Sequence, residues 1–191
     1  MLSQKVHEEQ KNALMQAVIS AVAEDGMENL STREISRRCG VKEVYIYRYF
    51  ENKDDMVAKT FAAEDEAFLQ TVLDSLPILR MDSIDHESCC RLMFTKCWNY
   101  IMGRPKQLIF YERYYYSSSF QKYSYKEHME RYEVLYKKME PAFADKGSVK
   151  TVLHYVFDTL LGQAMKQIND PQNADEAAET CFRLIYNAVT G

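Results

Sequence analysis

Apolar residues recur at the spacing of an α-helix along most of this chain, and this periodicity restricts the fold more than any other feature. Near the C-terminus, one segment carries Leu153, Val156, Phe157, Leu160, Leu161, Ala164 and Ile168, and the next carries Ala177, Ala178, Cys181, Leu184, Ile185 and Ala188. Such spacing places each set on one face of a helix. Only 6 glycines and 4 prolines interrupt the 191 residues. The sequence therefore predicts an all-α protein.

Helix caps and breakers predict where the individual helices begin and end. A first helix ends at Gly26, and a second begins at Ser31 or Thr32, with Glu34 placed to complete a capping box and Gly40 to stop it. Further helices are predicted at about 42–50, 52–76, 87–103, 106–117 and 121–145, with a connector at 78–87 and a turn at 169–173. The two apolar segments that flank this last turn are expected to form an antiparallel hairpin.

The two short helices on either side of Gly40 have the organisation of a helix-turn-helix. In that motif a tight turn, usually with glycine, joins a bracing helix to a second helix that lies in the DNA major groove. We expect Ile35 to pack inward with Val41 and Ile46, which leaves Arg33, Lys42 and Arg48 outward. Residues 31–53 carry six basic and three acidic side chains, a local charge of +3 in a chain of −4, so the remainder carries −7. This asymmetry is typical of a DNA-binding module attached to another domain.

Several short motifs surround the helix-turn-helix: ED-G at 24–26, then LSTREIS, CGV, YIYRYF and NKDDM. Through these motifs, residues 11–57 resemble the N-terminal domain of the TetR family of bacterial transcriptional regulators. The rest of the chain is similar to that family only in its helices and its length. The resemblance implies an N-terminal three-helix helix-turn-helix DNA-binding domain at 1–55 and a C-terminal helical effector-binding and dimerisation domain at 56–191. It also implies a homodimer with a four-helix interface.

The resemblance further implies which residues contact DNA. Thr32 and Tyr47 match positions whose hydroxyls contact phosphates, and Lys53 matches a lysine that meets the DNA backbone. The positions that face base edges correspond to Arg33, Lys42, Glu43, Val44, Tyr45 and Arg48. An arginine there could pair with guanine, and a glutamate could accept from cytosine. Val44 and Tyr45 are bulkier than the residues usual in the family, which leaves the operator sequence open.

A second group of tyrosines lies between residues 111 and 136 and is too dense for one helix face. A pocket lined by aromatic and methionine side chains would suit an apolar or aromatic effector. The candidates for this pocket are Trp98, Met102, Phe110, Tyr114, Phe120 and Phe157. The same rings could instead be ordinary core residues, and both interpretations stay open. The final hairpin resembles the family's dimer interface, for which the candidates are Val156, Leu160, Leu161, Ala164, Cys181, Leu184, Ile185 and Ala188.

The sequence predicts no catalytic residue, metal site or cofactor. His86, Cys89 and Cys90 lie close together, but their spacing is not that of a zinc site, and no glycine-rich phosphate loop occurs. Five cysteines without paired spacing favour reduced thiols. No apolar run reaches the ~18 residues of a membrane span, and the first residues lack the apolar stretch of a signal peptide. A cytoplasmic protein without a membrane partner is expected.

These features predict a transcriptional regulator, in the first instance a repressor. It would bind a pseudo-palindromic double-stranded DNA operator as a homodimer and respond to an unidentified small-molecule effector. Two alternatives belong to other classes. A protein with the family fold could act as a co-activator through a protein partner, which the bulky Val44 and Tyr45 suggest. A small-molecule-binding enzyme is the other alternative, and the missing catalytic set disfavours it.

Overall fold

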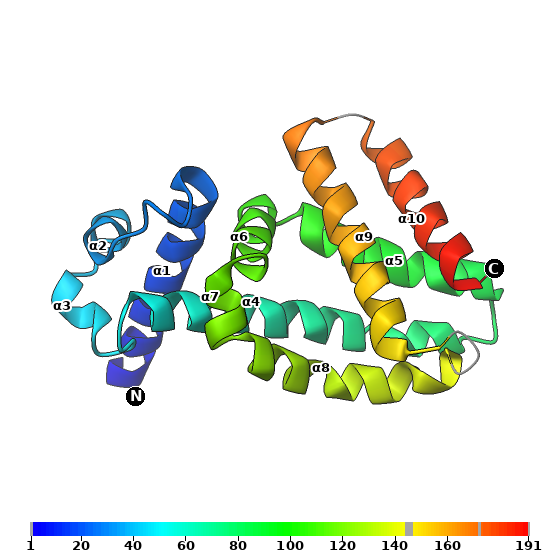
Figure 1. The fold of residues 1–191 in the computed structure, drawn as a ribbon, viewed down its shortest axis with the longest axis horizontal. Helices are drawn as coiled ribbons and strands as arrows, with labels where there is room; N and C mark the ends of the chain where they lie inside the picture. The colour runs from blue at the N-terminus through cyan, green and yellow to red at the C-terminus, as the bar shows by residue number, and fades with distance from the viewer. Residues whose placement is uncertain (1, 144–146, 172, 191) are drawn as a thin grey trace. The chain divides into compact units, whose positions relative to one another are not determined.

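The computed structural model describes residues 2–143, 147–171 and 173–190, which form helices joined by short turns, with no strand among them (Figure 1). Contacts divide the chain into an N-terminal unit, residues 1–65 and 109–128, and a C-terminal unit, residues 66–108 and 129–191. The predicted all-α fold class is confirmed. The predicted functional boundary after residue 55 stays a prediction, because these units follow packing alone.

The N-terminal unit contains the helix-turn-helix. It is built from α1 (Leu2–Asp25), α2 (Thr32–Cys39), α3 (Glu43–Ile46), the first part of α4 (Lys53–Leu73), most of α6 (Pro105–Tyr115), α7 (Ser118–Tyr123) and the start of α8 (Tyr125–Met139). Leu14, Val18 and Val22 are buried at the predicted helical spacing, and α1 packs on α2. Gly26, at φ +89°, donates its N–H to the carbonyl of Val22 and ends α1 in the left-handed conformation that glycine adopts most easily.

A cluster of aromatic rings forms the second core of the N-terminal unit. Phe61 of α4 is fully buried, and its ring centroid lies 4.8 Å from that of Tyr111, 5.0 Å from that of Tyr114 and 5.3 Å from that of Phe120. Aromatic pairs at this separation stabilise a core beyond the area that they bury. The cluster joins α4 to α6 and α7, segments that are far apart in the sequence.

Three buried polar side chains lie beside this cluster. Asp65 of α4 has no exposed surface, and its Oδ1 accepts a hydrogen bond of 2.9 Å from the hydroxyl of Tyr111. Its Oδ2 lies 2.9 Å from Nδ1 of His128, which is 4% exposed. A buried carboxylate is tolerated when its oxygens are hydrogen-bonded in this way. The sequence shows no local signal for this arrangement, because its members come from three helices.

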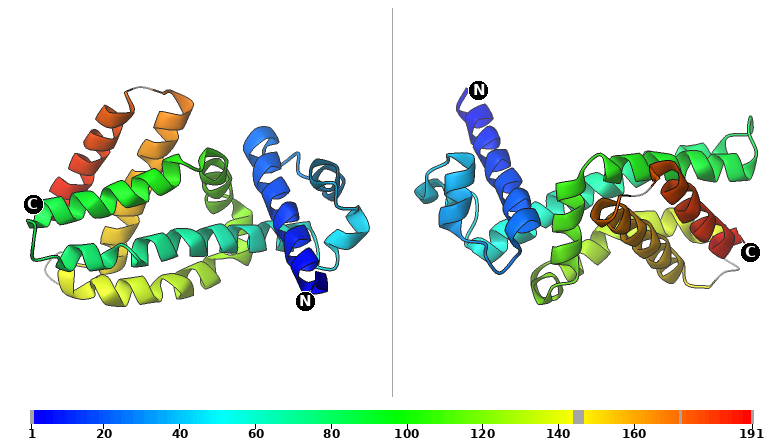
Figure 2. Two further views of the ribbon diagram at one scale, coloured as in Figure 1. Left: turned by 180° about the vertical axis from the view of Figure 1, so that it is seen from behind. Right: turned by 90° about the horizontal axis from the view of Figure 1, so that it is seen from above.

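The C-terminal unit contains the final hairpin. Its elements are the remainder of α4, η1 (Leu76–Arg80), α5 (His86–Met102), most of α8, η2 (Glu140–Ala142), α9 (Val149–Asn169) and α10 (Ala174–Thr190). α9 and α10 run antiparallel side by side, and both pack on α5 (Figures 1 and 2). The ring centroids of Phe182 and Phe94 lie 5.5 Å apart. The Arg91 guanidinium lies 4.0 Å from the centroid of the Phe182 ring, a cation–π contact. The predicted hairpin is confirmed.

Three predicted helix boundaries are wrong. The helix expected at 42–50 is shorter, because α3 ends at Ile46 and the chain continues in turns to Phe50. The helix expected at 121–145 is two helices, α7 and α8, which break at Ser124, a buried residue whose hydroxyl bonds that of Tyr114 at 2.9 Å. η1 occupies the start of the expected connector. Residues 144–146, where the helix expected at 121–145 was to end, fall outside the described residues. Residue 172, in the turn expected at 169–173, does so as well.

Among the described residues, no helix combines the length and the apolar character that a membrane span requires.

Candidate nucleic-acid interface

Local hydrogen bonds determine how α2 leads into α3. Ser31 caps α2, since its Oγ accepts from the backbone N–H of Glu34 at 3.2 Å. Gly40 ends the helix at φ +72° and donates its N–H to the carbonyl of Ser36. The Ser36 hydroxyl then donates to the carbonyl of Val41 at 2.7 Å, which fixes the residue after the turn. The turn of the helix-turn-helix is therefore specified by residues 31–41 themselves.

The second half of the predicted capping box is wrong. The Glu34 carboxylate accepts from Arg37 at 2.6 and 2.9 Å and from Arg38 at 2.8 Å, instead of turning back to the N–H of Ser31. Hydrogen bonds from Arg37 first, and then from Arg38, lower the pKa of Glu34 to about 2. Two cationic donors on the following turn of α2 compete better for a carboxylate than one neutral amide does.

Arg38 belongs to the packing of α1 on α2. Its guanidinium donates to Glu24 and Asp25 at the end of α1, both at 2.5 Å, and to Glu34. The Arg38 side chain is only 18% exposed. The hydrogen bonds that Arg38 donates to Glu24 and then to Glu34 raise the pKa of Arg38. The positive charge of the segment 31–53 is therefore partly neutralised at Arg37 and Arg38, and the other basic side chains form its exposed positive surface.

The nine predicted DNA contacts lie on α2, the turn before α3, α3 itself, the turns after it and the start of α4, and none of them is buried. Arg33, Lys42, Val44, Tyr47, Arg48 and Lys53 are exposed, and Thr32, Glu43 and Tyr45 are half-buried. Ile35 and Ile46 are fully buried, as predicted, whereas Val41 is only half-buried. Val44 is 68% and Tyr47 58% exposed, although both have large apolar side chains. Two large exposed side chains of this kind, on α3 and directly after it, suit an interaction surface.

The basic side chains of this surface differ in their contacts. Within the described residues, the Arg33 and Lys42 side chains make no hydrogen bond or ion pair. The Arg48 guanidinium lies 4.5 Å above the Tyr45 ring, a cation–π contact. Lys53 Nζ donates to the carbonyl of Leu30 at 3.3 Å. Two cations are thus free, and two are held by weak contacts that a phosphate could replace.

Sequence reasoning did not find the contact that holds the end of this motif to α1. The Tyr49 hydroxyl donates to Oε1 of Gln10 at 2.9 Å and lies 3.1 Å from Nδ1 of His7. The His7 and Tyr49 rings meet edge to face at 6.1 Å. These partners are about forty residues apart, and no local pattern in the sequence signals such a pair.

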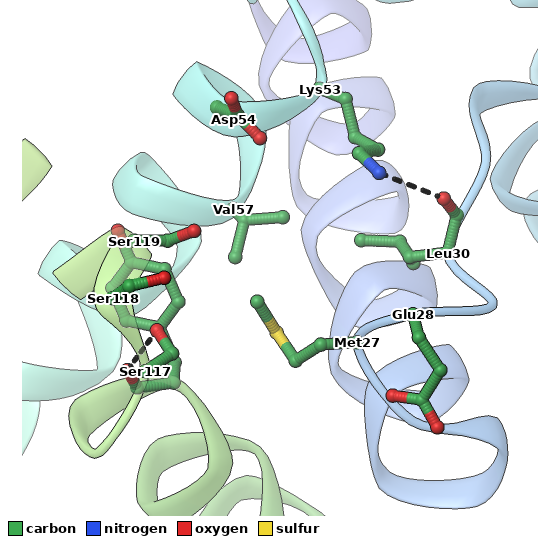
Figure 3. Close-up of a pocket in the computed structure, with 10 residues that line it drawn as sticks. Met27, Glu28, Leu30, Lys53, Asp54, Val57, Ser117, Ser118 and Ser119 are labelled. Atoms are coloured by element: carbon green, nitrogen blue, oxygen red, sulfur yellow. Dashed lines mark hydrogen bonds between the residues drawn. The ribbon is translucent and has the colours of Figure 1, made fainter. Parts of the chain in front are cut away.

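A cavity of about 320 Å³, lined in part by Lys53, lies in the N-terminal unit (Figure 3). Its lining residues are Met27, Glu28, Leu30, Lys53, Asp54, Val57, Tyr114 and Ser117–Ser119. Figure 3 shows the Met27 side chain extending toward Val57, while the Lys53 amino group turns to the Leu30 carbonyl. Tyr114 is one of the residues predicted for the effector pocket, and its hydroxyl is hydrogen-bonded to the hydroxyl of Ser124.

The six predicted effector-pocket residues fall in both units. Phe110, Tyr114 and Phe120 are buried in the N-terminal unit, the latter two in contact with Phe61. Trp98, Met102 and Phe157 lie in the C-terminal unit. Trp98 stacks on Phe94 at 5.7 Å, and Phe157 meets Phe68 at 5.6 Å. The described rings are thus packed on one another, and the effector pocket stays a prediction.

Three of the eight residues predicted for the dimer interface are covered by their own chain. Leu160, Ala164 and Cys181 are 3%, 0% and 0% exposed, so these side chains have no surface to offer a partner. Their apolar periodicity reflects the packing of α9, α10 and α5 instead. Val156, Leu161 and Ile185 are half-buried, and Leu184 and Ala188 are exposed. Of the eight predicted residues, these five have surface that a partner could contact.

The described residues contain no group of three side chains placed to hold a metal ion. The sulfur of Cys90 lies 3.5 Å from Nε2 of His86, one turn earlier on α5. Burial raises the pKa of the Cys90 thiol. All five cysteines are free thiols.

Comparisons with known proteins bear on both units. Residues 14–60 match the family model described as "Bacterial regulatory proteins, tetR family". No curated protein matches this chain. Solved structures with a similar fold include a TetR family transcription regulator from Marinobacter aquaeolei VT8, with 17% identity, 98% of each chain covered and a TM-score of 0.80. A putative tetR family regulator from Shewanella sp. PV-4 has 16% identity, coverage of 93% and 96%, and a TM-score of 0.74.

FadR from Bacillus subtilis, solved in complex with stearoyl-CoA, is a further structure of this kind. It has 18% identity, coverage of 91% of this chain and 96% of that one, and a TM-score of 0.67. At these identities the likeness shows the fold. The chain has the fold of a TetR family transcription regulator, with a helix-turn-helix followed by a helical domain.

Proposed function

We propose that this protein, with its TetR-type helix-turn-helix at residues 14–60, is a repressor that binds a pseudo-palindromic operator as a homodimer and releases it when a small molecule binds. The exposed face of α2 and α3 supports this proposal most strongly. That face presents Arg33, Lys42 and Arg48, while Ile35 and Ile46 anchor the two helices in the core. Exposed cations on a rigidly packed short helix suit recognition of a DNA groove.

In the proposed complex, α3 lies in the major groove, and two such helices are about 34–36 Å apart in successive grooves. Tyr47 and Lys53 contact phosphates and set the register. Arg33 and Arg48 are the residues that can bond guanine in bidentate form. Val44, the most exposed residue of α3, suits contact with a thymine methyl group.

The DNA-binding proposal is tested by selecting sequences from a random duplex pool, followed by titration of the selected site at several salt concentrations. We expect an inverted repeat, and a site-specific affinity that falls with salt. Arg48→Ala should weaken binding by about tenfold or more, as loss of a bidentate base contact does. Arg37→Ala is the matched control, because Arg37 is 71% exposed but already paired with Glu34. Binding no tighter than to random DNA would exclude the regulator proposal.

The homodimer is proposed to form through the exposed apolar part of α10. Leu184 is 46% exposed and Ala188 is exposed one turn later. Leu184→Glu should convert a dimer into monomers, measured by sedimentation velocity, because it places an unpaired charge in an apolar interface. Val134→Glu on α8, at 42% exposure, is the control that should stay dimeric. A wild-type protein that is monomeric at the concentrations where it binds DNA would contradict this part of the proposal.

The proposed effector is a small molecule with a large apolar part. Trp98, Met102 and Phe157, three of the predicted pocket residues, lie in the C-terminal unit, and apolar and aromatic side chains suit a ligand of this class. A ligand that prefers the state unable to span the operator lowers DNA affinity by its differential affinity for the two states. Stearoyl-CoA is a reasoned first probe, because the similarly folded FadR from Bacillus subtilis holds it. The measurement is release of labelled operator on addition of the probe.

A second candidate function is suggested by the exposure of Val44. At 68% exposure this valine would suit a protein partner as well as a DNA groove, and the protein would then act as a co-activator. Under that function, Arg48→Ala and Lys53→Ala would leave its regulatory activity unchanged. The titrations described above therefore separate the two candidates.

A further inference from the structure

A side-chain hydrogen bond links the first residues of the two helices of the helix-turn-helix. The Thr32 hydroxyl, at the start of α2, donates to Oε1 of Glu43, at the start of α3, at 2.5 Å. Both side chains are half-buried. The contact spans the Gly40 turn and joins residues that are eleven positions apart. It therefore limits the rotamers of both side chains at the edge of the exposed face.

This hydrogen bond is at odds with a phosphate contact at Thr32. A hydroxyl has a single hydrogen to donate, and a phosphate oxygen can only accept. Thr32 has given its hydrogen to Glu43, so it has none to offer a phosphate while this bond is kept. The Glu43 carboxylate next to it also repels a phosphate. The family resemblance alone implies instead that the Thr32 hydroxyl contacts a phosphate.

Glu43 is an anion on a surface that is otherwise basic. Within the described residues it makes no ion pair, although the exposed Lys42 precedes it and the exposed Arg33 follows its partner Thr32 in the sequence. An unpaired carboxylate brought close to DNA costs binding free energy unless the DNA gives it a hydrogen-bond donor. In the major groove, the exocyclic amino groups of cytosine and adenine are such donors, and glutamate is suited to N4 of cytosine.

We propose that Thr32 is a positioning residue for base recognition, which holds the Glu43 carboxylate so that it accepts a hydrogen bond from N4 of a cytosine in the operator half-site. One Glu43 oxygen bonds the threonine, and the other remains for the base. The restricted rotamer makes the contact selective, because a mobile carboxylate could also reach neighbouring bases. This inference rests on the proposed DNA-binding function.

The test compares Thr32→Val, Thr32→Ser and Glu43→Ala on the selected operator and on duplexes in which each base of one half-site is changed in turn. Thr32→Val removes the hydroxyl and keeps the shape. We expect it to reduce the preference for cytosine at one position by roughly 3- to 10-fold, with the salt slope unchanged. Glu43→Ala should abolish the preference at that same position. Thr32→Ser should restore it.

The opposite result is equally specific. A phosphate contact at Thr32 predicts that Thr32→Val weakens binding to all sequences alike, with no change in base preference, and this outcome would overturn the inference. Thermal unfolding of each variant identifies any loss of folding, and Thr32→Ser keeps the test valid if Thr32→Val unfolds. If the wild-type protein selects no site, the proposed function itself fails, whereas a selected site without this cytosine overturns the inference alone.

Discussion

Arg38 shows how a single residue can serve packing in a segment whose charge suggests DNA binding. Its guanidinium contacts three carboxylates on α1 and α2, and its side chain is largely buried. Arg37 shares the Glu34 carboxylate. At the scale of residues, the surface open to DNA is therefore narrower than the count of basic residues implies, and it is formed by Arg33, Lys42, Arg48 and Lys53.

The lowered pKa of Glu34 predicts how acid affects the stability of the contact between α1 and α2. Its pKa in the folded protein is lowered from 4.5 to about 2, chiefly by the hydrogen bonds from Arg37 and then Arg38. A group whose pKa is lower in the folded state stabilises that state above its unfolded pKa, and this contribution is lost as pH falls toward the folded value. We expect the contribution of Glu34 to disappear between pH 4.5 and pH 2.

This pH dependence is measured by chemical unfolding of wild type and Glu34→Gln across that interval. The two proteins should differ most above pH 4.5 and converge near pH 2. Arg37→Gln is the control, since removing the strongest donor should shift the convergence to higher pH. A difference between wild type and Glu34→Gln that stays constant with pH would show that the ion pairs do not form in solution.

At the scale of elements, the turn between α2 and α3 depends on the backbone of Gly40. This residue adopts φ +72°, and a Cβ added there would meet no atom within 4 Å. A substitution at Gly40 is therefore opposed by backbone strain and not by crowding. At Gly162 an added Cβ would likewise meet nothing within 4 Å. Gly162 differs in its backbone, because it lies within the helix α9.

Substitution by alanine should therefore have opposite effects on the free energy of unfolding at Gly40 and at Gly162. Gly40→Ala should lower the free energy of unfolding by about 1–2 kcal/mol, the cost of a left-handed alanine. Gly162→Ala should raise it by about 0.5–1 kcal/mol, because alanine is the better helix former. Urea unfolding measures both values. Equal effects of the two substitutions would mean that the turn does not adopt the left-handed conformation in solution.

At the scale of the whole molecule, a buried polar link ties α4 to α6 and α8 within the N-terminal unit. Asp65 accepts from Tyr111 and lies against His128, so one carboxylate orients two side chains of the segment 109–128. The Phe61 cluster packs beside it. The segment that follows residue 108 thus belongs by packing to the unit that contains the helix-turn-helix.

Removal of this carboxylate should be strongly destabilising. Asp65→Ala deprives two buried polar groups of their acceptor, and we expect the free energy of unfolding to fall by about 3–5 kcal/mol. Glu66→Ala, at the exposed neighbouring position on α4, should change it by less than about 0.5 kcal/mol. Calorimetry compares the two variants. An Asp65→Ala protein as stable as wild type would show that the three side chains do not form this buried link.

The amino-acid sequence by itself determined the helical class, the turn at Gly40, the buried faces of α1, α2 and α3, and the final hairpin, because each follows from periodicity or capping between near neighbours. The tertiary structure decided which of the predicted residues are accessible. Only packing shows that Arg38 and Cys181 are covered by their own chain, and that Ser124 breaks a helix. The pairing of Thr32 with Glu43 likewise depends on the geometry of the folded turn.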